Sequence, residues 1–154
     1  MKYKKILFVC SGNLCRSPMA EVILRDICAK DSELSAGGIV IRSAGTLDYP
    51  DGEPATNEAI TVTQKQGIDL SSHRAKHINA NLLNWADIVL VMTPEHKVDI
   101  LEEFGDPAKK VFLLTEFVGK RGFVSDPMGL GLEAYRQCAN QLLNLLTLFK
   151  KQLI

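Results

Sequence analysis

Two cysteines and an arginine stand close together between Cys10 and Arg16, directly after a short apolar run. A cysteine thiolate is a nucleophile, and the planar guanidinium of arginine can bind two oxygens of a phosphate at once. The stretch contains Gly12 and ends in Ser17-Pro18, which is typical of the start of a helix. Backbone N–H groups of such a loop, together with the positive end of the helix, attract anions. The spacing Cys-x5-Arg-Ser therefore predicts a phosphate-binding loop with a nucleophile at its first residue.

The chemistry expected of this loop is phosphoryl transfer through a covalent cysteine intermediate. Cys10 would attack phosphorus, and the helix end and Arg16 would stabilise its thiolate. Ser17, beside the sulfur, would stabilise the thiolate that departs in the second step. The residues of the predicted loop are Ser11, Gly12, Asn13, Leu14, Cys15, Arg16 and Ser17. The sequence lacks the pattern Gly-x4-Gly-Lys-Ser/Thr, which argues against a nucleotide-hydrolysing enzyme.

The other cysteines have different expected roles. Cys28 and Cys138 lie on the apolar faces of predicted helices and should be ordinary buried residues. Cys15 shares the loop with Cys10, so a reversible disulfide that protects the nucleophile from over-oxidation is a hypothesis that the sequence leaves open. The cysteines form no paired Cys-x-x-Cys motifs, so no metal site is expected.

Strands and helices alternate along the chain, which is typical of an α/β fold, a three-layer sandwich in which helices cover both faces of a parallel sheet. Buried strands are predicted at 4–9, 39–42, 88–92 and 110–114. Helices are predicted after Ser17 as N-cap, over 54–66, from 94 to about 103, and from Glu133 towards the C-terminus. Residues 1–154 are expected to form a single domain.

Expulsion of an alkoxide or a phenoxide from phosphorus requires a proton donor. Parallel α/β sheets bind ligands beyond the carboxyl ends of their strands, where the loop after Cys10 also lies. Of the two Asp-Pro pairs, Asp106-Pro107 precedes the last predicted strand and belongs to the opposite edge, whereas Asp126-Pro127 follows that strand. Asp126 is therefore the predicted general acid, and its carboxylate would afterwards act as base on the attacking water.

The composition is that of an ordinary globular protein, with 46% hydrophobic and 23% charged residues. The 18 basic and 18 acidic residues cancel, so neither nucleic acid nor a membrane surface is an expected partner. The apolar run near the N-terminus is too short for a signal peptide, and no stretch is long enough to span a membrane. We expect a cytoplasmic protein whose cysteines are thiols.

Motifs spread along the whole chain extend this pattern: VCSGNLCRSPMAE at 9–21, RSAGT at 42–46, GIDLSSHRA at 67–75, ADIVLVM at 86–92 and SDPMG at 125–129. In these motifs the chain resembles the low-molecular-weight protein tyrosine phosphatases. The resemblance implies a four-stranded parallel sheet and a two-step phosphatase mechanism without metal or cofactor. It implies that Cys10 is the nucleophile, Arg16 the phosphate clamp and Asp126 the general acid. It also implies a phosphorylated protein as substrate, with phosphate or other oxyanions as ligands.

The resemblance also assigns roles to residues around the catalytic ones. The loop asparagine, Asn13, would hold a strained backbone geometry through polar contacts with Ser17, Ser43 and His73. Tyr49 would form an aromatic wall beside the ring of the substrate.

Leu14 and Met128 complete the predicted rim of the site and bear on its substrate. Tyrosine-specific members often carry aromatic residues just after the Asp-Pro pair, where this chain has Met128, Gly129 and Leu130. In this departure the chain resembles bacterial relatives that include protein arginine phosphatases. Those arginine phosphatases carry threonine at the position of Leu14. An apolar Leu14 favours an aryl group, because it cannot hydrogen-bond near a guanidinium. Phosphotyrosine is therefore the predicted substrate, with phosphoarginine as the alternative.

The sequence also bears on functions of other classes. An arsenate reductase on this scaffold would need cysteines around the third strand, and residues 81–91 contain none. A phosphoprotein-binding module without turnover would have no use for Cys10 and Asp126. A thiol redox sensor that uses Cys10 and Cys15 is a further non-hydrolytic alternative.

Overall fold

The computed structural model describes residues 2–154 and contains one parallel sheet of four strands. The strands lie in the order β2-β1-β3-β4. Their bounds are β1 (Lys5–Cys10), β2 (Val40–Gly45), β3 (Ile88–Val91) and β4 (Val111–Leu113). The predicted α/β fold with a four-stranded parallel sheet is confirmed. The predicted strand bounds agree with the observed ones within one residue, except that β2 continues three residues beyond its predicted end, to Gly45.

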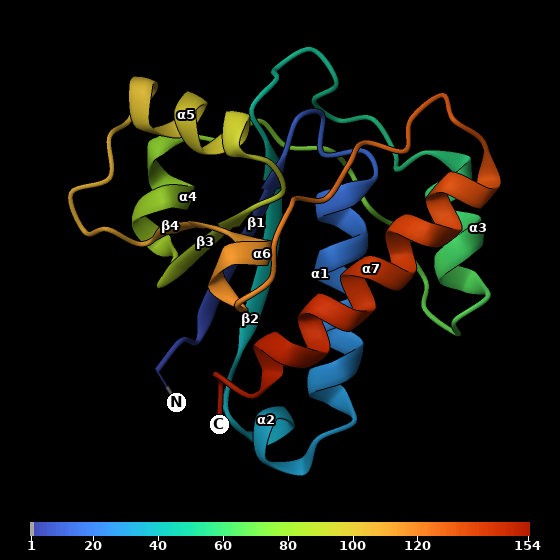
Figure 1. The fold of residues 1–154 in the computed structure, drawn as a ribbon, viewed down its shortest axis with the longest axis horizontal. Coiled ribbons are helices and arrows are strands. Elements are labelled where there is room, and N and C mark those ends of the chain that lie inside the picture. The colour runs from blue at the N-terminus through green and yellow to red at the C-terminus, as the bar shows by residue number, and fades with distance from the viewer. Residues whose placement is uncertain (1) are drawn as a thin grey trace.

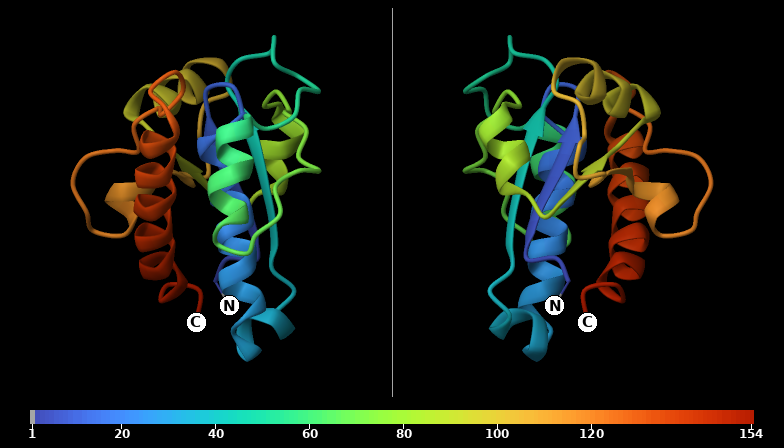
Figure 2. Two further views of the ribbon diagram at one scale, coloured as in Figure 1. Left: turned by 90° about the vertical axis from the view of Figure 1, so that its right-hand side faces the viewer. Right: turned by 90° about the vertical axis from the view of Figure 1, so that its left-hand side faces the viewer.

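Helices cover both faces of the sheet (Figures 1 and 2). Helices α1, α3 and α7 lie on one face, and α4 and α5 lie on the other. The helices are α1 (Arg16–Ala29), α2 (Ser32–Ala36), α3 (Asn57–Gln64), α4 (Ala80–Trp85), α5 (Pro94–Glu103), α6 (Leu114–Phe117) and α7 (Leu132–Lys150). The expected three-layer sandwich is therefore observed.

The alternation of side chains along β1 determines where its last residue points. Ile6 and Phe8 belong to the core beneath α1 and α7, and Leu7 and Val9 belong to the core beneath α4 and α5. These four side chains are fully buried, and each such burial contributes about 1.5–3 kcal/mol. Cys10 follows the same alternation and lies on the side of α1.

Strand order places two loops next to each other at the carboxyl edge of the sheet. Strand β1 lies between β2 and β3, and α1 follows β1 on one face while α5 follows β3 on the other. The connections after β1 and β3 therefore diverge, which is the arrangement at which α/β proteins bind ligands.

The start of α1 differs from the prediction. The N-cap is Cys15 and not Ser17, and the helix begins at Arg16. The Ser17 hydroxyl does not cap the helix because it contacts Cys10 and Asn13 inside the loop. The predicted helix at 54–66 is shorter and begins at Asn57, since the side chain of Thr56 accepts the capping hydrogen bond.

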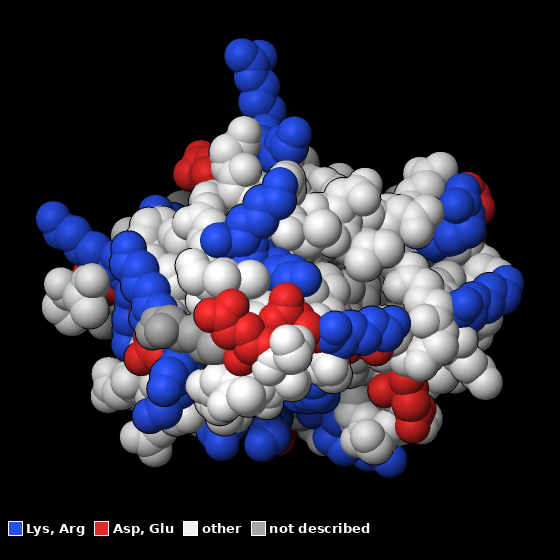
Figure 3. Space-filling model, turned by 90° about the horizontal axis from the view of Figure 1, so that it is seen from below, with Lys and Arg blue, Asp and Glu red and all other residues white. Residues whose placement is uncertain are grey.

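The surface seen from below in Figure 1, where both termini lie, carries interspersed acidic and basic side chains (Figure 3). Among residues 2–154, none of the helices is both long and apolar enough to cross a membrane.

Candidate active site

The loop after β1 places a buried thiol beside a buried hydroxyl. Cys10 is 1% exposed, and its Sγ lies 2.9 Å from the Oγ of Ser17 in the first turn of α1. A hydroxyl at this distance can donate a hydrogen bond to a thiolate. Ser17 can therefore stabilise the charged form of Cys10.

Asn13 fixes the shape of the loop. Its φ of 57° lies in the left-handed region, which non-glycine residues seldom adopt. The Asn13 amide donates to Ser17 Oγ at 2.8 Å and to Ser43 Oγ at 2.9 Å, and it accepts from the backbone N–H of Lys76 at 2.9 Å. His73 Nε2 lies 2.7 Å from the Asn13 carbonyl oxygen. The structure thus brings the three expected supporting residues to Asn13, and these contacts hold its strained backbone.

The end of β2 packs against the backbone of the same loop. A Cβ atom at Gly45 would lie 2.6 Å from the carbonyl oxygen of Ser11 and 2.9 Å from the backbone nitrogen of Asn13. The backbone N–H of Thr46 donates to the Cys10 carbonyl, and that of Leu47 donates to the Ser11 carbonyl, both at 2.9 Å. Only glycine allows this close approach of two backbones.

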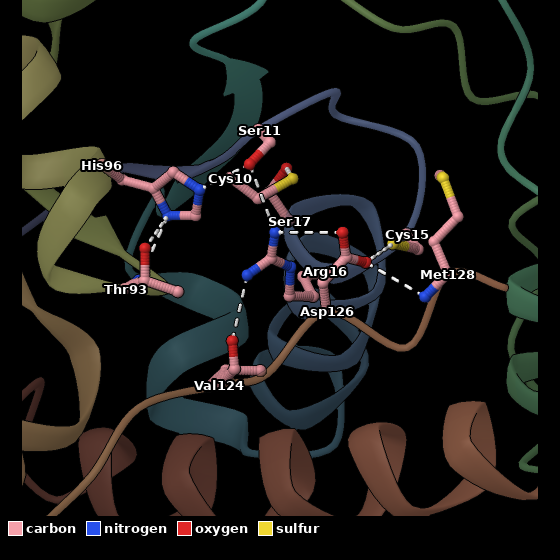
Figure 4. Close-up of polar contacts among 10 residues, drawn as sticks. All are labelled: Cys10, Ser11, Cys15, Arg16, Ser17, Thr93, His96, Val124, Asp126 and Met128. Carbon is pink, nitrogen blue, oxygen red and sulfur yellow. Dashed lines mark hydrogen bonds and ion pairs between the residues drawn. The ribbon is translucent and has the colours of Figure 1, made fainter. Parts of the chain in front are cut away.

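Arg16 is buried to 3% exposure and directs its guanidinium across the loop (Figure 4). Its Nη1 donates to the carbonyl of Val124 at 3.0 Å, and its Nη2 donates to Ser11 Oγ at 3.3 Å. The Arg16 Nε is buried and has no hydrogen-bond partner within the described part of the chain. A buried donor without a partner is costly, and an oxyanion in the loop would satisfy it.

The Asp126 carboxylate lies beside the guanidinium of Arg16 (Figure 4). Its Oδ2 lies 3.7 Å from Arg16 Nη2, its Oδ1 accepts from the backbone N–H of Met128 at 3.1 Å, and its side chain is 49% exposed. The carboxyl group is thus held by its neighbours and open to solvent on one side. This is a suitable position for proton transfer to and from a bound substrate.

Asp106 lies elsewhere, as its place in the sequence predicts. It precedes β4, and its two carboxylate oxygens accept from the backbone N–H groups of Lys110 at 3.0 Å and Val111 at 3.1 Å. This carboxylate fixes the chain that enters β4, at the edge opposite the loop.

The four cysteines are all buried and free. Burial raises the pKa of Cys15, with the nearby Cys10 and Asp126 adding to the effect, so Cys15 is a thiol that donates to Asp126 Oδ1 at 3.6 Å. Burial also raises the pKa of Cys28, and it raises that of Cys138 to about 12.

The rim of the site carries exposed apolar groups. Leu14 is half-buried, and its side chain and that of Pro50 both lie close to Gly12. Tyr49 is 80% exposed in the segment after β2, and Met128 is 44% exposed beside Asp126. These side chains are available to contact a substrate.

His96 and Glu21 contact the site but were missed by the sequence analysis. His96 is 3% exposed, and its Nε2 lies 2.9 Å from Ser11 Oγ. Glu21 accepts a hydrogen bond from Ser43 Oγ at 2.6 Å. The signal for His96 is its position in the first turn of a predicted helix that follows a strand at the functional edge.

Two histidines at the site are held neutral. Burial, followed by the charge of Arg16, lowers the pKa of His96 to about 4. Burial also lowers the pKa of His73, although its bond to Asn13 opposes this effect. Residues 2–154 contain no group of three or more acidic, histidine or cysteine side chains that could hold a metal ion.

Comparison with known proteins gives concordant matches. A family model described as low molecular weight phosphotyrosine protein phosphatase matches residues 5–154. A protein-arginine-phosphatase of Bacillus subtilis (strain 168) is 39% identical over 149 residues, which cover 96% of this chain and 95% of that protein.

Two solved structures are similar over nearly the whole chain. The low molecular weight protein tyrosine phosphatase from T. tengcongensis has a TM-score of 0.87 and 40% identity, and the match covers 96% of this chain and 97% of that one. A cysteine-to-serine mutant of YwlE arginine phosphatase, with a phosphorylated active site serine, has a TM-score of 0.86 and 39% identity. That match covers 96% of this chain and 94% of the mutant.

Proposed function

We propose that this chain, which belongs to the low molecular weight phosphotyrosine protein phosphatase family, hydrolyses phosphotyrosine in proteins with Cys10 as nucleophile. The main support for these catalytic roles is that a thiol, a guanidinium and a carboxylate come together at one loop. The buried Cys10 thiol begins the loop, the Arg16 guanidinium with its unpartnered Nε ends it, and Asp126 lies 3.7 Å from that guanidinium.

The first step transfers the phosphoryl group to sulfur. The Cys10 thiolate attacks phosphorus, the bond from phosphorus to the tyrosine oxygen breaks, and Asp126 gives its proton to that oxygen. Arg16 and the loop N–H groups hold the phosphoryl oxygens during the transfer.

The second step releases phosphate. The Asp126 carboxylate takes a proton from water, the water oxygen attacks phosphorus, and the sulfur–phosphorus bond breaks. The hydrogen bond from Ser17 stabilises the departing Cys10 thiolate.

Leu14 and Tyr49 support an aryl substrate. Leu14 offers an apolar side chain with no hydrogen-bonding group at the rim, and Tyr49 offers an exposed ring. An aromatic ring can pack on both, whereas a guanidinium would lose its water against Leu14 without gaining a hydrogen-bond partner from that side chain.

Phosphoarginine is the second candidate substrate. The observation that favours it is the 39% identity with a protein-arginine-phosphatase, together with the non-aromatic Met128 at the rim. Both candidates share the same nucleophile, clamp and acid.

The test measures kcat/KM on phosphotyrosine and phosphoarginine peptides of matched sequence. The expected result is a preference of wild type for phosphotyrosine, and a shift of at least tenfold towards phosphoarginine in Leu14→Thr. A preference of wild type for phosphoarginine overturns the proposed substrate and leaves the mechanism intact. A wild type that binds either peptide without turnover favours the binding or redox alternatives.

The proposed location is the cytoplasm, and the proposed partner is a phosphorylated protein, with free phosphate as product and ligand. The proposed mechanism requires Cys10 as a free thiol, which is the state that a reducing compartment maintains.

A further inference from the structure

Two donors converge on the hydroxyl oxygen of Ser11 (Figure 4). His96 Nε2 lies 2.9 Å from Ser11 Oγ, and Arg16 Nη2 lies 3.3 Å from the same atom. Ser11 therefore connects a histidine on α5 to the arginine that is proposed to hold the phosphate.

The backbone at the start of α5 fixes which nitrogen of His96 carries the proton. The backbone N–H of Thr93 donates to His96 Nδ1 at 3.1 Å, so Nδ1 must be an unprotonated acceptor. In a neutral ring the proton is then on Nε2, which donates it to Ser11 Oγ. Position N3 of the capping box, usually glutamate or glutamine, is here occupied by His96, which therefore serves the helix and the loop together.

The occupancy of Ser11 Oγ has a direct consequence for the loop. A hydroxyl oxygen accepts two hydrogen bonds and donates one. Because His96 and Arg16 take both accepting positions, the hydroxyl proton of Ser11 remains for another acceptor, such as an oxygen of a bound phosphoryl group.

We propose that His96 is a positioning residue for the phosphatase reaction, which acts through Ser11 to fix the guanidinium of Arg16 and to keep the Ser11 hydroxyl a donor towards the phosphoryl group. The inference rests on the proposed function, since it names how that site is held. His96 touches neither the nucleophile nor the acid in this structure.

Topology and charge agree with this role. Helix α5 follows β3, which pairs with β1 directly below the loop, so the rigid sheet holds the distance between His96 and Ser11. The charged or titratable groups around the ring are Arg16, Asp126 and the exposed Glu95. With its pKa lowered to about 4, His96 adds no second positive charge beside Arg16 at neutral pH.

Two substitutions separate the helix contact from the loop contact. In His96→Gln the amide nitrogen can occupy the place of Nε2 and donate to Ser11, while the acceptor for Thr93 N–H is lost. In His96→Asn the amide oxygen can occupy the place of Nδ1 and accept from Thr93, while the contact with Ser11 is lost. The two variants therefore form a matched pair.

The proposal predicts opposite rankings for activity and stability. His96→Asn should lose about tenfold in kcat/KM on phosphotyrosine peptide and bind inorganic phosphate several-fold more weakly, while it stays the more stable variant in urea. His96→Gln should be less stable, with phosphate affinity and kcat/KM within about threefold of wild type. If His96→Asn, the more stable variant, also had the higher activity and the higher phosphate affinity, the proposal would be overturned.

A double-mutant cycle tests whether Ser11 carries the effect. Addition of His96→Asn to Ser11→Ala should cost no further activity, because the connection is already broken. Full additivity of the two losses would overturn the proposal. An inactive wild type would instead contradict the proposed function. In that case the affinity of each variant for inorganic phosphate, measured by direct binding, would still decide the role of His96.

Discussion

At the scale of single residues, Arg16 is held by contacts from its own loop and from the distant segment that contains Val124 and Asp126. The Val124 carbonyl, the Ser11 hydroxyl and the Asp126 carboxylate each contact one of its terminal nitrogens. The guanidinium is planar, so these contacts also orient its Nε. The position of the proposed clamp is therefore set before a phosphoryl group enters, which is what electrostatic stabilisation of a transition state requires.

The role of Asp126 predicts a loss that depends on the leaving group. Asp126→Asn should reduce kcat on phosphotyrosine by about a hundredfold or more, because the phenoxide then leaves without a proton. The loss on para-nitrophenyl phosphate should be smaller, since nitrophenoxide is stable without protonation. Steady-state rates on both substrates provide the measurement.

Asp106→Asn is the matched control for this experiment. It weakens the contacts that fix the chain before β4, so it should lower the free energy of unfolding by about 1 kcal/mol and leave kcat near that of wild type. Equal kcat values for Asp126→Asn and wild type on phosphotyrosine would contradict the assignment of the acid.

Burial of His96 predicts a pH dependence of stability. Its pKa is lowered from 6.5 to about 4 on folding, so between these values the unfolded chain binds the proton more readily. The contribution of His96 to stability is complete above pH 6.5 and is lost as the pH falls towards 4. Between pH 7 and pH 5 this loss amounts to about 2 kcal/mol.

Urea unfolding of wild type and His96→Gln at pH 7 and pH 5 isolates this effect, because His73 and the carboxylates are common to both proteins. The wild type should lose about 2 kcal/mol more than the variant on acidification. The same loss in both proteins would show that His96 does not titrate in this way.

At the scale of elements, the end of β2 is as important for the site as the end of β1. Gly45 packs directly against the backbone of Ser11 and Asn13, and the two residues after it donate hydrogen bonds to the loop. The loop therefore has the sheet itself as its support.

This packing predicts a large effect of one added methyl group. Gly45→Ala places a Cβ 2.6 Å from the Ser11 carbonyl oxygen, so the loop must move. We expect a loss of about 1–3 kcal/mol in the free energy of unfolding and of at least tenfold in kcat/KM.

Gly12→Ala serves as the comparison for stability alone, because its added Cβ would meet its nearest neighbours at an ordinary 3.5 Å. A Gly45→Ala protein that is as stable as Gly12→Ala, with wild-type activity, would contradict the account of this packing.

Most elements could be predicted from the sequence, and the exceptions have physical causes. The strands are short buried apolar runs between turn residues, so their pattern is clear. Helices α2, α4 and α6 were not predicted, because helices of six residues or fewer are too short to show a helical period. The start of α1 was placed too late because Ser17 resembles an N-cap while its hydroxyl serves the loop.

At the scale of the whole molecule, the parallel sheet collects the site from distant segments. The loop after β1, the end of β2, the start of α5 and the segment after β4 all meet at the carboxyl edge. The meeting of Cys10, Arg16 and Asp126 at this edge could be predicted, because their residue types suit one chemistry and topology selects the edge. The position of His96 after the third predicted strand places it at the same edge, but its contact with Ser11, 85 residues away, could not be predicted, because only the observed pairing of β1 with β3 reveals it.

The central claim is that the phosphoryl group passes through the sulfur of Cys10. Its most direct test is rapid acid quenching during turnover of a phosphotyrosine peptide, followed by peptide mapping by mass spectrometry. The account predicts a phosphoryl group on Cys10 in the wild type, and neither adduct nor turnover in Cys10→Ala. Phosphate release by Cys10→Ala at the wild-type rate, or a phosphoryl group trapped on another residue, would contradict it.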